Sequence, residues 1–327
     1  MTLEQDTSEL ADARSFQQRL LVWFDQHKRN LPWRRDRDPY RVWLSEIMLQ
    51  QTRVAGVTEH YERFLRRFPN IEKLASAREA SVLAAWSGLG YYRRARMLHA
   101  AAKKIVKEHG GKFPEKAEDL RALPGIGRYT ASAIASITFD EPVAVVDGNV
   151  ERVLQRVHGK NLSGENLWRA AEELLSRGRP GDFNQGMMEL GATVCLPRQP
   201  QCLLCPVFDL CATRGELQRP GKGTRQTKRE IHYVLACHNG SIFLVQRPKT
   251  ATLMPGMWEL PETVGANGTN VTWLTLRHSI TVTDYVVRVL RRSAPKGLEG
   301  RWVRKSRVAT LPLTGLARKI LRAAKIV

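Results

Sequence analysis

A short turn, Leu-Pro-Gly-Ile-Gly at residues 123–127, constrains the fold most strongly, because it joins two stretches of helical periodicity. Glycine adopts the left-handed backbone of a tight turn and lets main-chain N–H groups approach a ligand closely. The second helical stretch starts directly after the turn, and a helix N-terminus favours an anion such as phosphate. The pattern predicts a helix, a hairpin and a helix over about residues 117–138 that together hold phosphate groups.

Two residues with useful side-chain chemistry follow this turn. Tyr129 comes directly after Arg128, at a position where a lysine would be a Schiff-base nucleophile. Asp147 lies 18 residues further on, before another helical stretch, so a packed helix can bring it back beside the turn. Taken singly, Tyr129 can equally be a core aromatic and Asp147 an ordinary helix cap, because an aspartate before Gly-Asn caps helices far more often than it catalyses.

The charge of the chain favours a nucleic-acid partner. Its 327 residues include 52 Lys and Arg against 32 Asp and Glu, a formal net charge of +20. A merely basic, solvated surface is the alternative. No apolar run approaches the ~20 residues of a membrane span, and the N-terminus lacks the pattern of a secretion signal. We therefore expect a cytoplasmic protein with no membrane partner, in which thiols stay reduced.

The period of the apolar residues divides the chain into two domains. The pattern is helical from Phe16 to Phe208 and changes after Ala212. Residues 216–229 are rich in Gly, Pro and basic residues without periodicity, which predicts a linker able to lie along DNA. An all-α domain is therefore expected over residues 1–215.

The rest of the chain, residues 230–327, predicts a small α+β domain. An Asn-Gly pair between two apolar runs indicates a β-hairpin of residues 231–237 and 241–245. A second pair of strands is expected at residues 277–282 and 285–290, followed by a helix near the C-terminus.

Four cysteines at uneven spacing indicate a metal site. Cys195, Cys202, Cys205 and Cys211 are separated by six, two and five residues, and only one Cys-x-x-Cys pair is present. The two knuckles of a zinc ribbon are therefore missing. The spacing favours a [4Fe-4S] cluster, whose iron atoms are more widely spread than a single ion, with structural zinc or unligated thiols as alternatives. Cys237, in a predicted strand, is expected to be a small buried hydrophobe.

With the turn, Asp147 and the cysteine spacing in hand, the chain resembles the helix-hairpin-helix base-excision glycosylases that carry an iron–sulfur loop. Within that superfamily it is similar to the adenine DNA glycosylases of the MutY type. The motifs that carry the resemblance span nearly the whole first domain in family order: Leu31 to Arg34, Trp43 to Thr52, Gly88 to Tyr92, Leu123 to Ala131, Val146 to Val150, Asn184 to Gly191 and the four cysteines.

The resemblance implies a monofunctional enzyme of base excision repair that acts on double-stranded DNA as a monomer. It would hydrolyse the N-glycosidic bond of adenine mispaired with 8-oxoguanine or guanine. Endonuclease III-like lyases carry a lysine at the position of Tyr129, and thymine-mismatch glycosylases share the tyrosine but lack the glutamate found here as Glu46. Retention of Glu46 and Asp147 favours adenine removal, with a bifunctional glycosylase/AP lyase or a non-catalytic mispair-binding protein as alternatives.

Four residues are the candidate catalytic groups. Glu46 is followed by Ile47, Met48 and Leu49, and an apolar pocket would raise its pKa and keep it protonated, although it could also be an exposed helix residue. The family resemblance implies that Glu46 protonates adenine N7 and activates water. Asp147, at a positive helix end, would stabilise the sugar cation. Tyr129 would supply a phenol hydrogen bond, and Asn149 would orient the water or the acids.

The same matching assigns the DNA contacts. Gln51 and Tyr91 correspond to wedge and stacking residues around the opposite base, although Tyr91 can also be a core-packing residue. Arg34 and Glu189 correspond to residues of the adenine pocket. Backbone phosphates would be held by three residues of the turn and the helix after it: Gly125, Gly127 and Thr130.

The C-terminal domain resembles the Nudix-like domain with which the family senses 8-oxoguanine. Glu262 is not followed by the carboxylate cluster that Nudix hydrolysis needs, so we expect no pyrophosphatase activity. The sensing loop corresponds to residues 278–282, where the family's aromatic residue and final histidine are absent. Thr281 retains a hydroxyl that could contact the lesion, and a plain strand with a polar face is the alternative. We expect weaker discrimination between 8-oxoguanine and guanine than is usual in the family.

Overall fold

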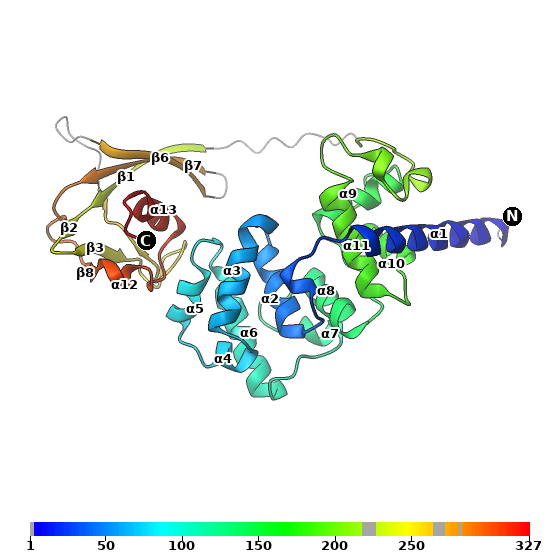
Figure 1. Cartoon of the computed structure of the whole chain (residues 1–327), viewed down its shortest axis with the longest axis horizontal. Helices are drawn as coiled ribbons and strands as arrows, with labels where there is room; N and C mark the ends of the chain where they lie inside the picture. Colours follow the sequence, from blue (N-terminus) through cyan, green and yellow to red (C-terminus); the bar gives the residue numbers. More distant parts are fainter. Residues whose placement is uncertain (1–2, 218–226, 264–271, 281–282) are drawn as a thin grey trace. The chain divides into compact units, whose positions relative to one another are not determined.

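The computed structural model describes residues 3–217, 227–263, 272–280 and 283–327 (Figure 1). The chain forms two compact units. The first unit consists of Met1–Tyr61, Asn70–Glu72 and Ala100–Pro220. The second unit consists of Glu62–Pro69, Lys73–His99 and Gly221–Val327. A part of the helical region therefore groups with the C-terminal strands.

All regular structure described up to residue 217 is helical, which confirms the predicted all-α character of this region. The helices are α1 Leu3–His27, α2 Pro39–Leu49, α3 Val54–Arg67, α4 Ile71–Ala75, α5 Glu79–Trp86, α6 Arg93–His109, α7 Ala117–Leu120, α8 Arg128–Phe139, α9 Gly148–Val157, α10 Gly164–Leu174 and α11 Pro180–Thr193. Three single turns of 3-10 helix complete the series: η1 Pro32–Arg34, η2 Cys202–Leu204 and η3 Phe208–Leu210. Within the described ranges, no helix is long and apolar enough to cross a membrane.

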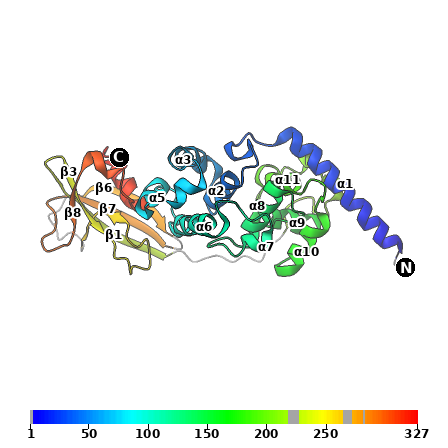
Figure 2. The ribbon, with the colours of Figure 1, turned by 90° about the horizontal axis from the view of Figure 1, so that it is seen from below.

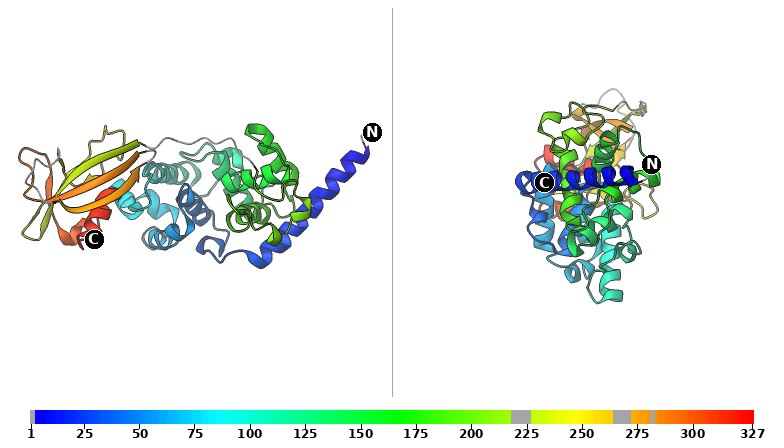
Figure 3. Two further views of the ribbon diagram at one scale, coloured as in Figure 1. Left: turned by 90° about the horizontal axis from the view of Figure 1, so that it is seen from above. Right: turned by 90° about the vertical axis from the view of Figure 1, so that its right-hand side faces the viewer.

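One hydrophobic core of the first unit lies between α1, α9, α10 and α11. Phe16, Leu20 and Phe24 repeat every four residues along one face of α1 and pack with Leu154 of α9 and Phe183 of α11. Each fully buried Leu or Phe side chain contributes about 1.5–3 kcal/mol of transfer free energy. Figures 2 and 3 show the N-terminal part of α1 extending beyond the helices on which it packs. The core anchors the later turns of α1 through these residues.

The predicted helix-hairpin-helix is present as α7, the turn after it and α8. Leu123 and Ile126 are buried at the base of the turn, where Ile126 N donates a hydrogen bond to Leu123 O at 3.2 Å. Gly125 has a φ of 76°, a left-handed conformation that favours glycine. The apolar residues fix the turn, and its glycines stay exposed.

The described part of the C-terminal region contains two small sheets and two helices. Its elements are β1 Thr227–Leu235, β2 Cys237–His238, β3 Ser241–Gln246, β4 Trp258–Glu259, β5 Glu262–Thr263, β6 Thr272–Ile280, β7 Thr283–Arg291, β8 Arg301–Arg304, α12 Lys305–Val308 and α13 Gly315–Ala323. One sheet has the order β5-β1-β7-β6, with β1 and β7 parallel, and in the other β3 pairs with β2, β4 and β8. Apolar residues of α13 pack with residues of both sheets, so the helix closes their common core (Figure 1).

The first predicted hairpin is wrong in extent. The Asn-Gly turn is present, with positive φ at Asn239 and Gly240, but only the end of the predicted first strand contacts β3. Phe243 N donates to Ala236 O at 3.1 Å, and Cys237 and His238 pair with β3 as β2. The preceding strand β1 pairs in parallel along its whole length with β7. Periodicity of two reports which side of a strand is apolar and not which strand it pairs with, so this distant partner was missed.

Predictions were also made for Cys237, for the linker and for the C-terminal elements. Cys237 is exposed and not buried, because it lies in the two-residue strand beside the turn. The strand β1 begins at Thr227, inside the predicted linker, and residues 218–226 lie outside the described residues. The second strand pair is confirmed as β6 and β7, and the predicted C-terminal helix as α13.

Candidate active site

Glu46 and Tyr129 meet inside the first unit, although they are 83 residues apart in sequence. The helix α2 begins where Asp38 accepts a hydrogen bond from Arg41 N, with Pro39 in its first turn, and it carries Glu46 into the interior. The phenol of Tyr129, on the first turn of α8, donates to Glu46 Oε2 at 2.6 Å. Glu46 is 6% exposed, so it is a buried acid and not a surface helix residue.

Burial raises the pKa of Glu46 to about 7. The hydrogen bond from Tyr129 lowers this pKa, the negative charge of Asp147 raises it, and the positive charge of Arg34 lowers it. Burial, together with the charges of Glu46 and Asp147, also raises the pKa of Tyr129 well above its ordinary value. The site therefore contains a carboxyl group that keeps a proton near neutral pH, as its apolar neighbours predicted.

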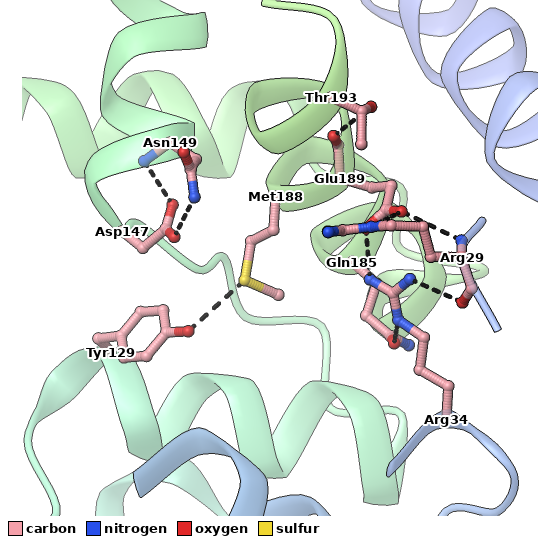
Figure 4. A network of polar contacts seen from close by, with 9 residues as sticks. All are labelled: Arg29, Arg34, Tyr129, Asp147, Asn149, Gln185, Met188, Glu189 and Thr193. Carbon is pink, nitrogen blue, oxygen red and sulfur yellow. Dashed lines mark hydrogen bonds and ion pairs between the residues drawn. The ribbon is translucent and has the colours of Figure 1, made fainter. Parts of the chain in front are cut away.

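Asp147 is both a helix cap and a neighbour of Glu46. Its Oδ1 accepts hydrogen bonds from Asn149 N at 2.8 Å and Val150 N at 2.7 Å, and its Oδ2 accepts from Asn149 Nδ2 at 3.1 Å (Figure 4). These bonds fix the carboxylate at the N-terminus of α9, and its charge influences Glu46. The capping and catalytic interpretations are therefore compatible.

Asn149 is in turn held by Arg152. Arg152 Nη2 donates to Asn149 Oδ1 at 2.9 Å and to Gly191 O at 2.6 Å, and its Nε donates to Cys195 O at 2.8 Å. A Cβ on Gly191 would lie 2.6 Å from Asn149 Cβ, so the close approach of α11 to α9 requires glycine here. Arg152, which also donates to the carbonyl of Cys195, thus fixes the orientation of Asn149 toward Asp147.

Glu189 forms the centre of an ion-pair network on α11. Arg29 Nε donates to Glu189 Oε1 at 2.6 Å and Arg29 Nη2 to Oε2 at 2.8 Å, while Arg34 Nη2 donates to Oε2 at 2.9 Å. Arg34 Nε also donates to Gln185 Oε1 at 3.1 Å. Although burial opposes ionisation, the hydrogen bonds from Arg29 and Arg34 bring the pKa of Glu189 down to about 2. Both oxygens of this predicted pocket residue are occupied by arginines.

Met188 separates the two sets of polar residues. In Figure 4, Tyr129 and Asp147 lie on one side of the Met188 side chain, and Glu189 lies with Arg29 and Arg34 on the other. The phenol of Tyr129 contacts the Met188 sulfur at 3.5 Å. Met188 thus places an apolar side chain between the phenol of Tyr129 and the ion-pair network.

The residues that were predicted to hold phosphate differ in their exposure to solvent. Gly125 and Gly127 are exposed on the turn before α8. Thr130 is 2% exposed, and its hydroxyl accepts a hydrogen bond from Gln50 Nε2 at 3.3 Å. Its side chain therefore supports the end of α2, while the glycines of the turn remain accessible to an anion.

The predicted wedge residues are both exposed and both have a left-handed backbone. Gln51 has a φ of 55° directly after α2, and Tyr91 has a φ of 47° before α6. Tyr91 is 50% exposed, so it is not a core-packing residue. Thr281 lies outside the described residues.

Cys195, Cys202, Cys205 and Cys211 line one small cavity. Arg156 Nη1 donates to Cys195 Sγ at 3.3 Å, and burial raises the pKa of the Cys205 thiol to about 11. Within the described residues, no group of three or more His, Cys, Asp or Glu side chains is gathered as a site for a single metal ion. The four cysteines are thus gathered around one space.

Sequence reasoning did not single out four residues that shape the site: Arg29, Arg152, Gln185 and Met188. Gln185 and Met188 stand within a motif that carried the resemblance, but their spacing alone does not show which of them faces Tyr129. Arg29 precedes the Leu31 to Arg34 motif by two residues. Its partner is 160 residues away, so only the fold reveals the pair.

The chain is similar to known proteins of DNA repair. Residues 44–177 match a family model described as HhH-GPD superfamily base excision DNA repair protein. The adenine DNA glycosylase of Mus musculus is 42% identical over 318 residues, which cover 78% of this chain and 61% of the mouse protein. The adenine DNA glycosylase of Rattus norvegicus is 50% identical over 231 residues, covering 66% of this chain and 44% of the rat protein.

Among solved structures, a thermostable thymine-DNA glycosylase matches with a TM-score of 0.59 and 30% sequence identity. The match covers 62% of this chain and 97% of that protein. The chain thus matches nearly the whole of this solved structure, but less than two thirds of the length of the two curated relatives.

Proposed function

Because the chain belongs to the HhH-GPD superfamily of base excision DNA repair proteins, we propose that it is a monofunctional glycosylase that removes adenine mispaired in double-stranded DNA. The observation that carries the proposal is the buried Glu46, whose pKa is about 7, beside Tyr129 and Asp147. The name shared by the curated mouse and rat relatives supports adenine as the base. The net charge of +20 supports DNA as the partner.

Hydrolysis of an N-glycosidic bond needs a proton for the departing base and stabilisation of a positive sugar. Glu46 still holds a proton near neutral pH and can donate it to adenine N7. The carboxylate left behind can then activate water. Asp147, held in place by Asn149 and Val150, presents negative charge to the sugar cation.

We assign Glu189 an indirect role in the base pocket. Both of its oxygens are engaged by Arg29 and Arg34, so it holds these arginines in place and does not contact the base itself. Arg34 and Gln185, which are linked at 3.1 Å, are then the groups that would contact the base. Glu189 is accordingly a positioning residue for Arg34.

The four cysteines are proposed to hold a [4Fe-4S] cluster. Their placement around a cavity and the Arg156 N–H directed at Cys195 Sγ fit a cluster of several metal atoms and its sulfur ligands. When bound, the cluster would supply a structural link that ties the loop of residues 195–211 together. Visible absorption from sulfur-to-iron charge transfer in the purified protein, with matching iron content, is the expected result. Zinc without visible absorption would contradict it.

We also propose that residues 230–327 are a Nudix-like lesion-recognition domain that reads 8-oxoguanine or guanine opposite the adenine. The paired sheets closed by α13 support this fold. Thr281 stays a candidate contact to the lesion. The protein is proposed to act as a monomer, with the basic segment before β1 along the DNA.

The proposed activity is tested by single-turnover release of adenine from a duplex with adenine opposite 8-oxoguanine or guanine. We expect free adenine and an abasic strand that breaks only after alkali. Tight mispair binding without release would instead indicate a non-catalytic binding protein. Trapping of a covalent DNA adduct by borohydride at the rate of base release would indicate a lyase, which the tyrosine at position 129 argues against.

A further inference from the structure

The turn between α5 and α6 holds Tyr91 in an unusual backbone conformation. Gly88, Gly90 and Tyr91 have φ values of 110°, 70° and 47°. The carbonyl of Gly90 accepts hydrogen bonds from Trp86 Nε1 at 3.1 Å and Arg94 Nη2 at 3.3 Å. A tyrosine at positive φ is strained and keeps this conformation only where its surroundings enforce it.

The residues that flank this turn are anchored by a segment more than 200 residues away in the same compact unit. Ser87 Oγ donates to Leu313 O at 3.0 Å, and Tyr92 Oη donates to the same carbonyl at 2.8 Å. Arg318 Nε, on α13, donates to Ser87 Oγ at 2.8 Å. A carbonyl has two lone pairs, so one acceptor serves both hydroxyls.

The accepting segment is itself fixed within the C-terminal strands. Trp258 N donates to Pro312 O at 2.8 Å, and Thr314 N donates to Trp258 O at 2.9 Å. Thr314 also caps α13, since its hydroxyl accepts from Ala317 N at 3.2 Å. The Leu313 carbonyl is therefore presented to the turn by a braced part of the chain.

We propose that Ser87, Tyr92 and the Leu313 carbonyl form a clamp by which the C-terminal region positions Tyr91 for stacking on DNA. The inference rests on the proposed function for the role of Tyr91, and it adds three residues that position this side chain without touching DNA. Ser87 and Tyr92 are 1% and 3% exposed, so their hydroxyls cannot reach a duplex. They act through the conformation of the exposed tyrosine between them.

Through the clamp, the C-terminal region positions Tyr91 in addition to any contact it makes with the opposite base. A stacked aromatic side chain contributes affinity only when its ring is held at the base step, because ordering it on binding costs free energy. A single buried hydrogen bond changes an equilibrium about two- to tenfold. Loss of one clamp hydroxyl should therefore have a measurable effect of this size.

The first test measures the turn in the free, full-length protein by hydrogen exchange. Tyr92→Phe keeps the ring and removes the bond to Leu313 O together with the 3.4 Å contact to Ser87 Oγ. Ser87→Ala removes the second bond to Leu313 O and also the acceptor of Arg318 Nε. We expect about fivefold faster exchange in the peptide of residues 87–94 for each variant. Tyr61→Phe is the matched control, because it removes another buried phenol that donates to a carbonyl, Arg41 O at 3.3 Å. It should leave this peptide unchanged.

The second test is a double-mutant cycle on binding to a duplex that carries an unhydrolysable adenosine analogue opposite 8-oxoguanine. Tyr91→Ala should weaken binding about tenfold and Tyr92→Phe about threefold. In the Tyr91→Ala background, Tyr92→Phe should have no further effect, because the hydroxyl acts through the tyrosine that is gone. Arg318 lines the same cavity as Tyr91 and is left unchanged, since its guanidinium could contact DNA itself.

The outcomes separate this inference from the proposed function. Unchanged exchange in both clamp variants overturns the clamp, as does faster exchange with unchanged binding. An equal loss of affinity with and without Tyr91 also overturns it, because the hydroxyl would then act on general stability. If the wild-type protein does not prefer a mispaired duplex, the proposed function fails, and the exchange measurement still decides whether the clamp holds the turn.

Discussion

Two buried glutamates of the first unit differ in charge: Glu46 keeps a proton near neutral pH, and Glu189 is ionised. Glu46 and Glu189 are 6% and 1% exposed, so both carboxyl groups have lost most of their contact with water. Glu46 has one neutral donor, Tyr129, and its pKa rises to about 7. Glu189 has two arginines, and its pKa falls to about 2. The same side chain at similar burial is an acid in one region and a fixed anion in the other.

This difference shows that the carboxyl groups of Glu46 and Glu189 are suited to different roles. Burial penalises the charged form of both carboxyl groups, and the two cationic hydrogen-bond donors at Glu189 offset that penalty. Because the cations are gathered at Glu189, Glu46 is left with a proton to donate. The region around Glu46 is therefore suited to chemistry, and the region around Glu189 to the rigid placement of Arg34.

The largest expected effect is on catalysis at Glu46. Glu46→Gln keeps the size of the side chain and removes the titrating proton, so adenine release should fall about a hundred- to ten-thousand-fold in single-turnover assays. The thermal unfolding midpoint should not fall, because a neutral amide suits this pocket. Release within threefold of the wild-type rate would contradict the assignment of Glu46 as the proton donor.

The second effect is on stability at Glu189. Glu189→Gln leaves Arg29 and Arg34 without their shared anion, which should cost about 3 kcal/mol in the free energy of unfolding. Urea denaturation measures this loss. Glu165→Gln is the matched control, because Glu165 pairs with Arg128 at 2.7 Å but is 79% exposed, and it should cost less than about 1 kcal/mol. Equal losses in the two variants would remove the distinction between anchor and surface pair.

The two glutamates should also give stability profiles of opposite slope with pH. The folded pKa of Glu46 lies above its ordinary value of 4.5, so its contribution is complete below pH 4.5 and is lost as the pH rises to about 7. The folded pKa of Glu189 lies below 4.5, so its contribution is complete above pH 4.5 and is lost as the pH falls to about 2. Each change amounts to about 3 kcal/mol.

These slopes are measured as the difference in unfolding free energy between the wild-type protein and each glutamine variant across pH. The Glu46→Gln difference should vary between pH 4.5 and 7, and the Glu189→Gln difference below pH 4.5. If both differences vary in the same pH range, the two carboxyl groups do not have distinct environments.

The smallest effect concerns the bond between Tyr129 and Glu46. This hydrogen bond lowers the pKa of Glu46, so Tyr129→Phe should raise it. The high-pH decline of adenine release should then move upward by about one pH unit or less. A downward shift would mean that the phenol stabilises the protonated form of Glu46.

The sequence predicted the surroundings of Glu46 better than those of Glu189. Glu46, Tyr129 and Asp147 were identified from their motifs and from the apolar neighbours of Glu46. Glu189 was predicted to belong to the adenine pocket, but its ion pairs with Arg29 and Arg34 were not predicted. Ion pairs between residues 155 and 160 positions apart leave no local pattern, so spacing could not reveal them.

The fold shows the same limit. Helices α7, α8, α9 and α13 were predicted because helical periodicity and capping are local properties. The parallel pairing of β1 with β7 was not predicted, since it joins strands separated by residues 236–282. The clamp on the turn of Tyr91 is equally non-local, because it joins Ser87 and Tyr92 to Leu313.

We propose that Glu46 donates a proton because burial raises its pKa to about 7. Single-turnover adenine release from the mispaired duplex, measured from pH 5 to 9 with catalytic groups otherwise intact, tests it most directly. The rate should be highest at low pH and decline with an apparent pKa of about 7. A rate that stays constant across this range, or that rises through pH 7, would contradict proton donation by Glu46.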